Sequence, residues 1–399
     1  MKIKTIITTV LLFIVVKLAF GQNSWTQKAN FGGVSRVYPV GFSIGQKGYI
    51  GTGYDTVSYN DFWEWDPSTN VWTQKANFAG TSRWEAVGFS IGNKGYIGTG
   101  LSGLNEQSDF WEWDQATNTW TQKANFGGGI RRMATGFSIG NKGYIGTGFN
   151  GSFLLNDFWE WDQATNTWTQ KSNLPASARC QSISFSIETN GYIGMGYFTC
   201  GQPLGDFWEW DQTANTWTQK ANFGGTPRQG AVGFSIGKSG YVGTGDDGSL
   251  FHNDFWEWDK ATDTWIQRAS LPGNIRTFAC GFGTSSKGYI GTGMPSIGST
   301  LDDFWEYSAP LGISENNFSF KYSIFPNPYT SQTILQIDKQ LKNATLTLDN
   351  VFGQTVALIK NINGQTITLH RDNLPSGTYF LRLTQDSKVI ATDKLVISD

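Results

Sequence analysis

Residues 61–78 read DFWEWDPSTNVWTQKANF, and this block decides the fold because the chain repeats it. The block returns almost unchanged at 109–126 and 157–174, and recognisably at 206–223 and 254–271. A sixth copy begins at Asp303 but ends after DFWEY. The DFW triplets begin at positions 61, 109, 157, 206, 254 and 303, which gives steps of 48 or 49 residues. A fixed period of this length predicts a solenoid or a β-propeller.

Each period contains four segments with the pattern of a short β-strand, here called a, b, c and d. In the first period they are VGFSI, GYIGTG, DFWEWD and VWTQKA. Glycines flank the turn between a and b, as expected for a tight hairpin that needs positive φ angles. Side chains alternate between faces along such strands, and no helical periodicity appears in these segments.

The distribution of the d strands indicates a closed ring. Only five of the six c strands are followed by a d strand, and the missing copy, SWTQKANF, stands near the N-terminus at Ser24–Phe31. In a propeller this strand would complete the last blade, and closure would remove the exposed sheet edges. We therefore expect residues 22–307 to form an all-β, six-bladed β-propeller.

The repeats resemble the kelch-repeat β-propellers. The residues of the first unit that carry this resemblance are Arg36, Tyr49, Gly53, Asp61, Trp65, Asp66 and Trp72. The chain departs from the family pattern at Gly51-Thr52-Gly53, where kelch repeats have a double glycine, and at Trp65, where they usually have tyrosine. The resemblance implies a propeller that binds proteins or glycans, as most of the family does, although some members are enzymes.

The N-terminus has the pattern of a signal peptide over residues 1–21. Lys2 and Lys4 precede the apolar run Ile6–Val16, and Ala19-Phe20-Gly21 offers small residues for cleavage. We expect the mature chain to begin at Gln22, and no other apolar stretch is long enough to span a bilayer.

The C-terminal part has no repeat, so we expect a linker over residues 308–317 and a second domain over residues 318–399. This domain resembles the type A C-terminal sorting domain of the type IX secretion system. The matching segments are Phe325-Pro326-Asn327-Pro328, Asn350-Val351-Phe352-Gly353-Gln354, Gly377-Thr378-Tyr379-Phe380-Leu381 and Lys394-Leu395-Val396-Ile397. The resemblance implies an Ig-like β-sandwich that the secretion machinery recognises at the outer membrane, and a protein that is secreted or held at the cell surface.

Composition argues against several kinds of function. A net charge of −2 and a pI near 5.8 leave no basic surface for nucleic acid. The mature chain has two histidines, too few for a copper cluster, and a catalytic triad would depend on His252 alone. The three cysteines have no metal-site spacing, so we expect no metal and no cofactor.

Six arginines precede the a strands and form the first candidate site. They are Arg36, Arg83, Arg131, Arg179, Arg228 and Arg276. Because strand a lines the channel of a propeller, we expect the arginines at the mouth of the channel. Like charges repel, so either nearby carboxylates such as Asp61 neutralise the arginines or they contact an anionic ligand.

The loops between b and c differ most from blade to blade and share a face with the arginines. They contain the candidate binding residues Tyr54, Phe149, Phe198 and Phe251. Aromatic rings beside hydrogen-bonding groups suit a sugar or a protein partner, so we predict a binding or adhesion module. The alternative is that these loops fold over the rim and bury their rings.

A carbohydrate-active enzyme, such as a sugar-acid mutarotase or epimerase, is the alternative function. It would use the arginines together with one carboxylate that the other blades lack. Glu85 fits this description, because the positions aligned with it are Tyr38, Ala134, Gln181, Gly230 and Phe278. A purely structural component of a surface layer is a third possibility.

The cysteines suggest one disulfide in an exported protein. If the hairpin of the fourth blade turns between residues 189 and 190, residue 180 lies opposite residue 199, one residue from Cys200. A small bulge in the strand would then bring the two sulfur atoms into bonding range. We therefore predict a bond between Cys180 and Cys200, with Cys280 as a buried free thiol.

Overall fold

The computed structural model describes residues 23–198, 202–309, 322–350, 354–385 and 388–399. The expected signal peptide lies outside these residues, as does most of the expected linker. The chain divides into two compact units, Met1–Pro310 and Leu311–Asp399. All regular secondary structure in the described residues is β-strand.

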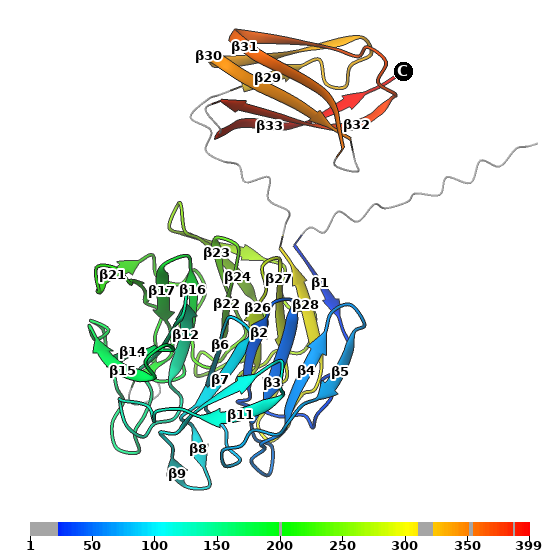
Figure 1. Ribbon diagram of the computed structural model, residues 1–399. Helices are drawn as coiled ribbons and strands as arrows, with labels where there is room; N and C mark the ends of the chain where they lie inside the picture. Colours follow the sequence, from blue (N-terminus) through cyan, green and yellow to red (C-terminus); the bar gives the residue numbers. More distant parts are fainter. Residues whose placement is uncertain (1–22, 199–201, 310–321, 351–353, 386–387) are drawn as a thin grey trace, which may run out of the picture. The chain divides into compact units, whose positions relative to one another are not determined.

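The first unit contains six antiparallel sheets of four strands each, arranged as the blades of a propeller (Figure 1). Blade one contains β2 (Val40–Ile44), β3 (Lys47–Gly51), β4 (Phe62–Asp66) and β5 (Val71–Gln74). Blade two contains β6 (Val87–Ile91), β7 (Lys94–Gly98), β10 (Phe110–Asp114) and β11 (Thr119–Gln122). Blade three contains β12 (Thr135–Ile139), β13 (Lys142–Gly146), β14 (Phe158–Asp162) and β15 (Thr167–Lys171). Blades four and five contain β16 (Ile183–Ile187), β17 (Asn190–Gly194), β20 (Phe207–Asp211) and β21 (Thr216–Lys220); and β22 (Val232–Ile236), β23 (Ser239–Gly243), β24 (Phe255–Asp259) and β25 (Thr264–Arg268). Two of the b–c loops contain short hairpins of their own, β8 (Leu101–Ser102) with β9 (Asn105–Glu106) and β18 (Tyr197–Phe198) with β19 (Gln202–Pro203).

The sixth blade confirms the predicted closure of the ring. It contains β26 (Cys280–Gly283), β27 (Lys287–Gly291) and β28 (Phe304–Ser308), and the N-terminal strand β1 (Ser24–Gln27) supplies its outer strand. Trp25 of β1 lies opposite Tyr307 of β28, and its indole N–H donates to the carbonyl of Ala269 at 2.8 Å. The innermost strand of each blade contacts that of the next, and β26 contacts β2.

Aromatic packing between neighbouring blades forms the core of the propeller. Trp113 of the second blade lies edge-on to Phe62 of the first, with ring centroids 5.0 Å apart, and also contacts Tyr49. Trp65 packs in the same way against Phe304 of the sixth blade, across the point where the ring closes. The second tryptophan of the c strand in each of the first five blades is therefore a buried structural residue.

The second unit is a sheet of five strands bent around one core. Its strands are β29 (Tyr322–Phe325), β30 (Gln332–Asp349), β31 (Thr355–His370), β32 (Gly377–Gln385) and β33 (Lys388–Ile397). The long strand β30 pairs with β29 along its first part and with β32 along its second part, while β31 follows its other edge through several register shifts. Leu335 and Leu346, from the two parts of β30, belong to the same buried cluster.

Candidate functional site

The six repeated arginines are buried inside the blades, with exposed fractions of 0–1%. Each forms an ion pair with the aspartate that begins strand c of its own blade. The pairs are Arg36–Asp61, Arg83–Asp109, Arg131–Asp157, Arg179–Asp206, Arg228–Asp254 and Arg276–Asp303. In the structure, nearby carboxylates therefore neutralise these arginines, which is the first of the two alternatives considered above.

The blade of Arg228 shows why these arginines are not ligand contacts. Nη2 donates to Oδ2 of Asp254 at 3.0 Å, and Nη1 and Nε donate to the carbonyls of Thr244 and Thr226, each at 3.0 Å. Burial alone would raise the pKa of Asp254, but the bonds from Arg228 outweigh it and the pKa is lowered. With its donors engaged and its surface covered, the guanidinium offers nothing to a ligand from solvent, and the ligand-contact hypothesis for the arginines is wrong.

The residues two positions after these arginines form a ring at the mouth of the channel. This channel-mouth ring consists of Tyr38, Glu85, Met133, Gln181, Gly230 and Phe278. All six have φ between 53° and 58°, which non-glycine residues adopt rarely. In five of the six positions the backbone amide donates to the ring residue of the preceding blade, for example Met133 to Glu85 at 3.0 Å and Tyr38 to Phe278 at 2.9 Å. The third-blade equivalent of Glu85 is thus Met133, and not Ala134 as we expected from the sequence.

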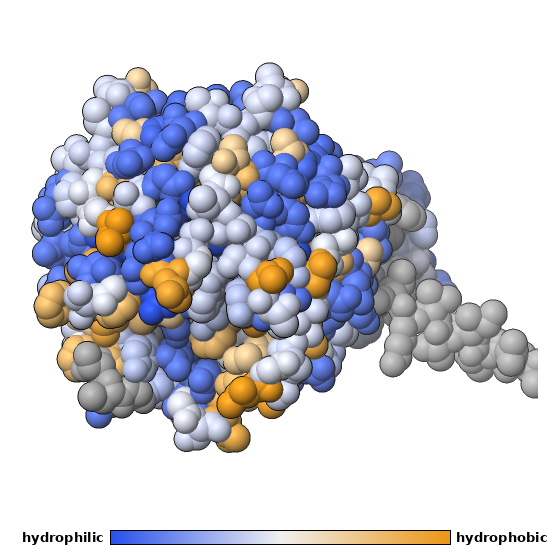
Figure 2. Space-filling view, turned by 90° about the horizontal axis from the view of Figure 1, so that it is seen from below, coloured by the Kyte–Doolittle hydropathy of each residue, from blue (hydrophilic) through white to orange (hydrophobic). Residues whose placement is uncertain are grey.

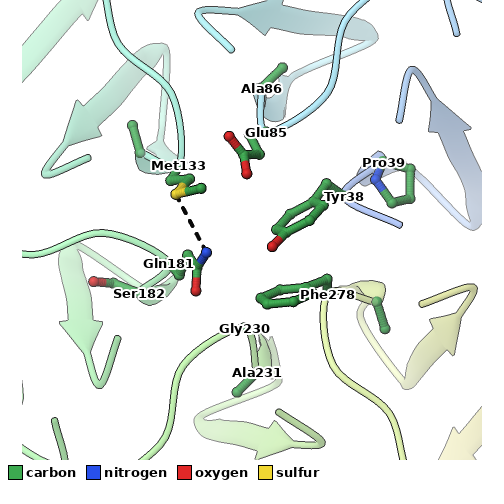
Figure 3. A pocket seen from close by; sticks show the side chains of 12 residues that line it. Tyr38, Pro39, Glu85, Ala86, Met133, Gln181, Ser182, Gly230, Ala231 and Phe278 are labelled. Carbon is green, nitrogen blue, oxygen red and sulfur yellow. Dashed lines mark hydrogen bonds between the residues drawn. The ribbon is translucent and has the colours of Figure 1, made fainter. Parts of the chain in front are cut away.

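The channel-mouth ring encloses a small cavity with a volume of about 160 Å³. The side chains of Glu85, Tyr38 and Gln181 point into this channel-mouth cavity from three different blades (Figure 3). The ring of Tyr38 stacks on Phe278, with centroids 4.2 Å apart and an interplanar angle of 21°. Polar side chains from three blades thus converge on one small cavity beside the rings and apolar side chains of Phe278, Met133 and Pro39.

Glu85 is the one carboxylic acid among the six ring residues, and it is only 4% exposed. Its Oε2 accepts a hydrogen bond from Nη1 of Arg132 at 3.3 Å, while its Oε1 is buried with no hydrogen-bond partner among the described residues. Burial raises the pKa of Glu85 to about 7, although Arg132 acts in the opposite direction. A carboxyl group in this environment exchanges its proton near neutral pH.

A larger recess lies beside the channel-mouth cavity and shares Met133 and Gln181 with it. This loop recess has a volume of about 830 Å³. Its lining residues are Arg132, Met133, Phe149, Leu154, Cys180, Gln181, Tyr197, Gln229, Asp246 and Gly248.

Three consecutive blades line the loop recess with residues at the same two positions of each blade. In each blade the residue after the repeated arginine bridges to the first residue of the b–c loop. The pairs are Arg132 with Phe149, Cys180 with Tyr197, and Gln229 with Asp246. The corresponding pairs of the other blades are Val37 with Tyr54, Trp84 with Leu101, and Thr277 with Met294. The two charged residues of these six pairs, Arg132 and Asp246, therefore both lie in the half that lines the recess.

The four aromatic residues expected to bind ligand are all half-buried, and one of them, Phe149, lines the loop recess. Tyr54 packs on Trp84, with ring centroids 5.1 Å apart. Phe198 lies in the β18–β19 hairpin, and Phe251 bridges to Asp246. The loops thus partly cover their own rings, as the alternative interpretation of these loops proposed.

Arg132 is a site residue that the sequence analysis missed. It is 25% exposed, lies over Phe149 with its guanidinium carbon 5.3 Å from the ring centroid, and is 3.5 Å from Glu106. The doublet Arg131-Arg132 was a visible signal, because the other blades have no charged residue after the repeated arginine.

The face of the propeller that carries the b–c loops also exposes an apolar residue at the tip of five loops. These residues are Val57, Leu104, Phe153, Leu250 and Ile297, with exposed fractions of 56–92%. Turns hold several of them in place: the amides of Phe153 and Leu250 donate to Asn150 and Asp247 at 2.8 and 2.7 Å. Figure 2 shows apolar patches spread around this loop face.

The cysteines differ from expectation. The hairpin of the fourth blade pairs Ile183 with Gly194, so Cys180 lies opposite Tyr197 and not opposite residue 199. Cys180 and Cys280 are both buried free thiols, which confirms the expectation for Cys280 and contradicts a disulfide at Cys180. Cys200, its expected partner, lies outside the described residues.

Two further properties bear on the class of protein. In the described part of the chain, histidine, cysteine, aspartate and glutamate side chains form no group of three or more that could hold a metal ion. The same residues include no helix with the length and hydropathy needed to cross a membrane. The fold and the site define a β-propeller with an asymmetric recess at the mouth of its channel, joined to a β-rich C-terminal domain.

Comparison with known proteins identifies the C-terminal domain. Residues 323–398 match the family described as the secretion system C-terminal sorting domain. This domain marks proteins that the type IX system secretes to the cell surface or the extracellular space, so the protein is exported and the type IX machinery is its partner.

The propeller is supported by likeness of structure. No curated protein matches the sequence significantly. Among solved structures, that of YjhT is similar, with a TM-score of 0.60 and 15% sequence identity over 69% of this chain and 95% of YjhT. At this level of identity the likeness shows the fold alone.

Proposed function

We propose that the protein is a cell-surface binding module that recognises a glycan in the loop recess of a kelch-type propeller. The observation that carries the proposal is the lining of that recess, where the rings of Phe149 and Tyr197 and the side chain of Leu154 stand beside the polar groups of Gln229 and Asp246. Sugars present apolar faces and hydroxyl edges together, and a mixed wall of this kind can bind both. The volume of about 830 Å³ is in the usual range of ligand sites and accommodates a short oligosaccharide.

The position of the recess supports the same function. The b–c loops that build it stand on a rigid ring of sheets, where variation in loops changes the ligand without disturbing the core. Export to the cell surface would expose this face to external polysaccharides and to the glycans of other cells.

A glycan array probed with the exported chain tests the proposal. Wild-type protein should bind a defined group of glycans, and Phe149→Ala should reduce that signal at least tenfold. Ile297→Ala is the control, because Ile297 is an apolar residue of another b–c loop, is 92% exposed and lies outside the recess lining, so this variant should bind as the wild type does. Binding by wild type and Phe149→Ala at equal strength would contradict a glycan site in the recess.

A second candidate is an enzyme that isomerises a carbohydrate at the channel-mouth cavity beside the recess. The observation that favours it is the pKa of about 7 for Glu85, since a carboxyl group that gains and loses its proton near neutral pH can act as a general acid or base. The six repeated arginines would not assist, because they are engaged with aspartates, so this candidate depends on Glu85 and Arg132. Interconversion of sugar anomers that is faster with wild type than with Glu85→Gln in proton NMR spectra would support it.

A further inference from the structure

Two buried acceptor oxygens face the channel-mouth cavity. Oε1 of Glu85 and Oε1 of Gln181 are both buried, and within the described residues neither has a hydrogen-bond partner. The hydroxyl oxygen of Tyr38 also points toward this space (Figure 3). Leaving buried acceptors unpaired costs free energy, so a ligand group that supplies hydrogens would be stabilised there.

Few donors near the cavity are available to these two oxygens. The amide nitrogen of Gln181 donates to the sulfur of Met133 at 3.4 Å. Nη1 of Arg132 donates to the other oxygen of Glu85, and its Nε, which has no hydrogen-bond partner in the described residues, lies 3.5 Å from Glu106. The hydroxyl of Tyr38 can donate one hydrogen, so a ligand that supplies further hydrogens completes the pairing of Glu85 Oε1 and Gln181 Oε1.

The number of acceptors discriminates between ligand groups. A sugar hydroxyl brings one hydrogen and could satisfy one oxygen, whereas a primary ammonium group brings three. Three oxygens from three blades converge on the cavity, which matches the three donors of an ammonium group in number.

The charges around the cavity favour a cation. Glu85, Glu106 and Asp246 are acidic, and Arg132 is the single basic side chain among the charged groups near Glu85 and Tyr38 in the described structure. Burial raises the pKa of Tyr38 well above its usual value and that of Cys180 to about 12, so both are neutral at physiological pH. When the three carboxyl groups are ionised, the surroundings carry net negative charge, and partial burial strengthens the attraction of a positive group.

We propose that the channel-mouth cavity binds a primary ammonium group of the ligand, held by oxygens of Glu85, Gln181 and Tyr38. Which molecule carries this ammonium group depends on the proposed function. If the recess binds a glycan, the ligand is an amino sugar whose amine is free, with the rest of the saccharide in the loop recess.

Protonation of Glu85 competes with binding of the ammonium group. A neutral carboxyl group has lost the charge that attracts the cation, so affinity should fall when the pH is lowered from 7 to 5.5. A lysine side-chain amine, with a pKa of about 10.4, stays protonated over this range, so the change in its affinity reports the carboxyl group.

Isothermal titration of the exported chain at pH 7 tests the inference. The probes are a glucosamine oligomer and its fully N-acetylated counterpart, which has the same sugar rings but no charged amine. We expect the amine form to bind at least tenfold more tightly, and Glu85→Gln to remove that preference. Nα-acetyl-lysine methyl ester keeps its ammonium charge from pH 7 to 5.5 and measures the dependence on pH, which Glu85→Gln should also remove. Glu188→Gln is the control of equal charge change, because Glu188 is exposed and pairs with Lys238 and Lys260 on another part of the propeller.

The outcomes separate this inference from the proposed function. If both oligomers bind equally and Phe149→Ala abolishes binding, the glycan site stands and the ammonium site is refuted. If neither oligomer binds but Nα-acetyl-lysine methyl ester binds with dependence on Glu85, the ammonium site stands and the glycan function is refuted. An unchanged preference for the amine in Glu85→Gln would also overturn the ammonium site.

Discussion

Replacing Glu85 with glutamine should stabilise the propeller at alkaline pH but not at acidic pH. Glutamine has nearly the shape of glutamate and is neutral at all pH values, so the substitution removes the buried charge without opening a cavity. Arg132 keeps a neighbouring carboxylate in Glu106, 3.5 Å away. The change therefore isolates the cost of keeping Glu85 ionised in its buried position.

The magnitude follows from the difference in pKa between the folded and unfolded chain. The pKa of Glu85 is about 7 in the folded protein, whereas an exposed glutamate has a pKa of about 4.3. Because the folded pKa is the higher one, the folded protein binds more protons between these values. The contribution of Glu85 to the stability of the wild type is therefore highest below pH 4.3 and is lost as the pH rises toward 7. At about 1.4 kcal/mol per pKa unit, the full difference corresponds to about 4 kcal/mol.

Urea unfolding followed by tryptophan fluorescence measures this effect in the whole chain. All 18 tryptophans precede residue 310, so the signal reports the propeller. Glu85→Gln and wild type should have similar stability at pH 4.5 and differ by up to about 4 kcal/mol at pH 8.5. Glu188→Gln should show no comparable gain. If the difference between Glu85→Gln and wild type were the same at both pH values, Glu85 would not have a raised pKa and the reasoning would fail.

Four further predictions follow from the fold. Arg228→Met should destabilise the propeller by about 3–5 kcal/mol in the same assay, because it leaves the buried carboxylate of Asp254 without a counter-ion; adding Asp254→Asn should restore part of the loss, and a loss below 1 kcal/mol would contradict the role of the pair. Deleting residues 22–31 removes β1, exposes the edge of β28 and should cause aggregation or a large loss of stability; an unchanged urea midpoint would argue against closure. Removing residues 318–399 should leave a folded propeller that stays in the periplasm, as measured by protease accessibility on intact cells, and normal surface amounts would rule out the sorting role. Thiol counting on denatured, unreduced protein should find three free thiols, and a count of one would show that Cys180 is bonded after all.

The architecture of the propeller could be predicted from the sequence because it depends on local and repeated information. Each period contains the strand lengths, the turn glycines and the alternation of side chains that specify one blade. The displaced copy at Ser24–Phe31 predicted the pairing of β1 with β28, since a d strand without a blade can be completed at one place in the ring. The C-terminal domain was likewise recognisable from segments spread over its whole length.

The site could be predicted only in part, because it depends on which side chains from different blades lie together. The sequence singled out Glu85 and Phe149, but neither the role of Arg132 nor the convergence of Tyr38 and Gln181 follows from any one repeat. The repeated arginines could not be assigned from the sequence, because solvent access decides between a ligand contact and a structural pair. In the folded chain each guanidinium forms an ion pair with the aspartate of its own blade and is buried from solvent.

Register in irregular segments is a further property that only the tertiary structure decided. Met133 occupies the third place in the channel-mouth ring because the ring residues share a positive φ and form backbone hydrogen bonds from blade to blade. An alignment of the repeats does not contain this information. A shift of one residue in the turn of the fourth blade likewise placed Cys180 opposite Tyr197. The sequence by itself determined the number of blades and their closure, because both are carried by strand patterns within each repeat. The recess and its chemistry were decided by tertiary contacts, because they arise where loops of unlike sequence meet across the mouth of the channel.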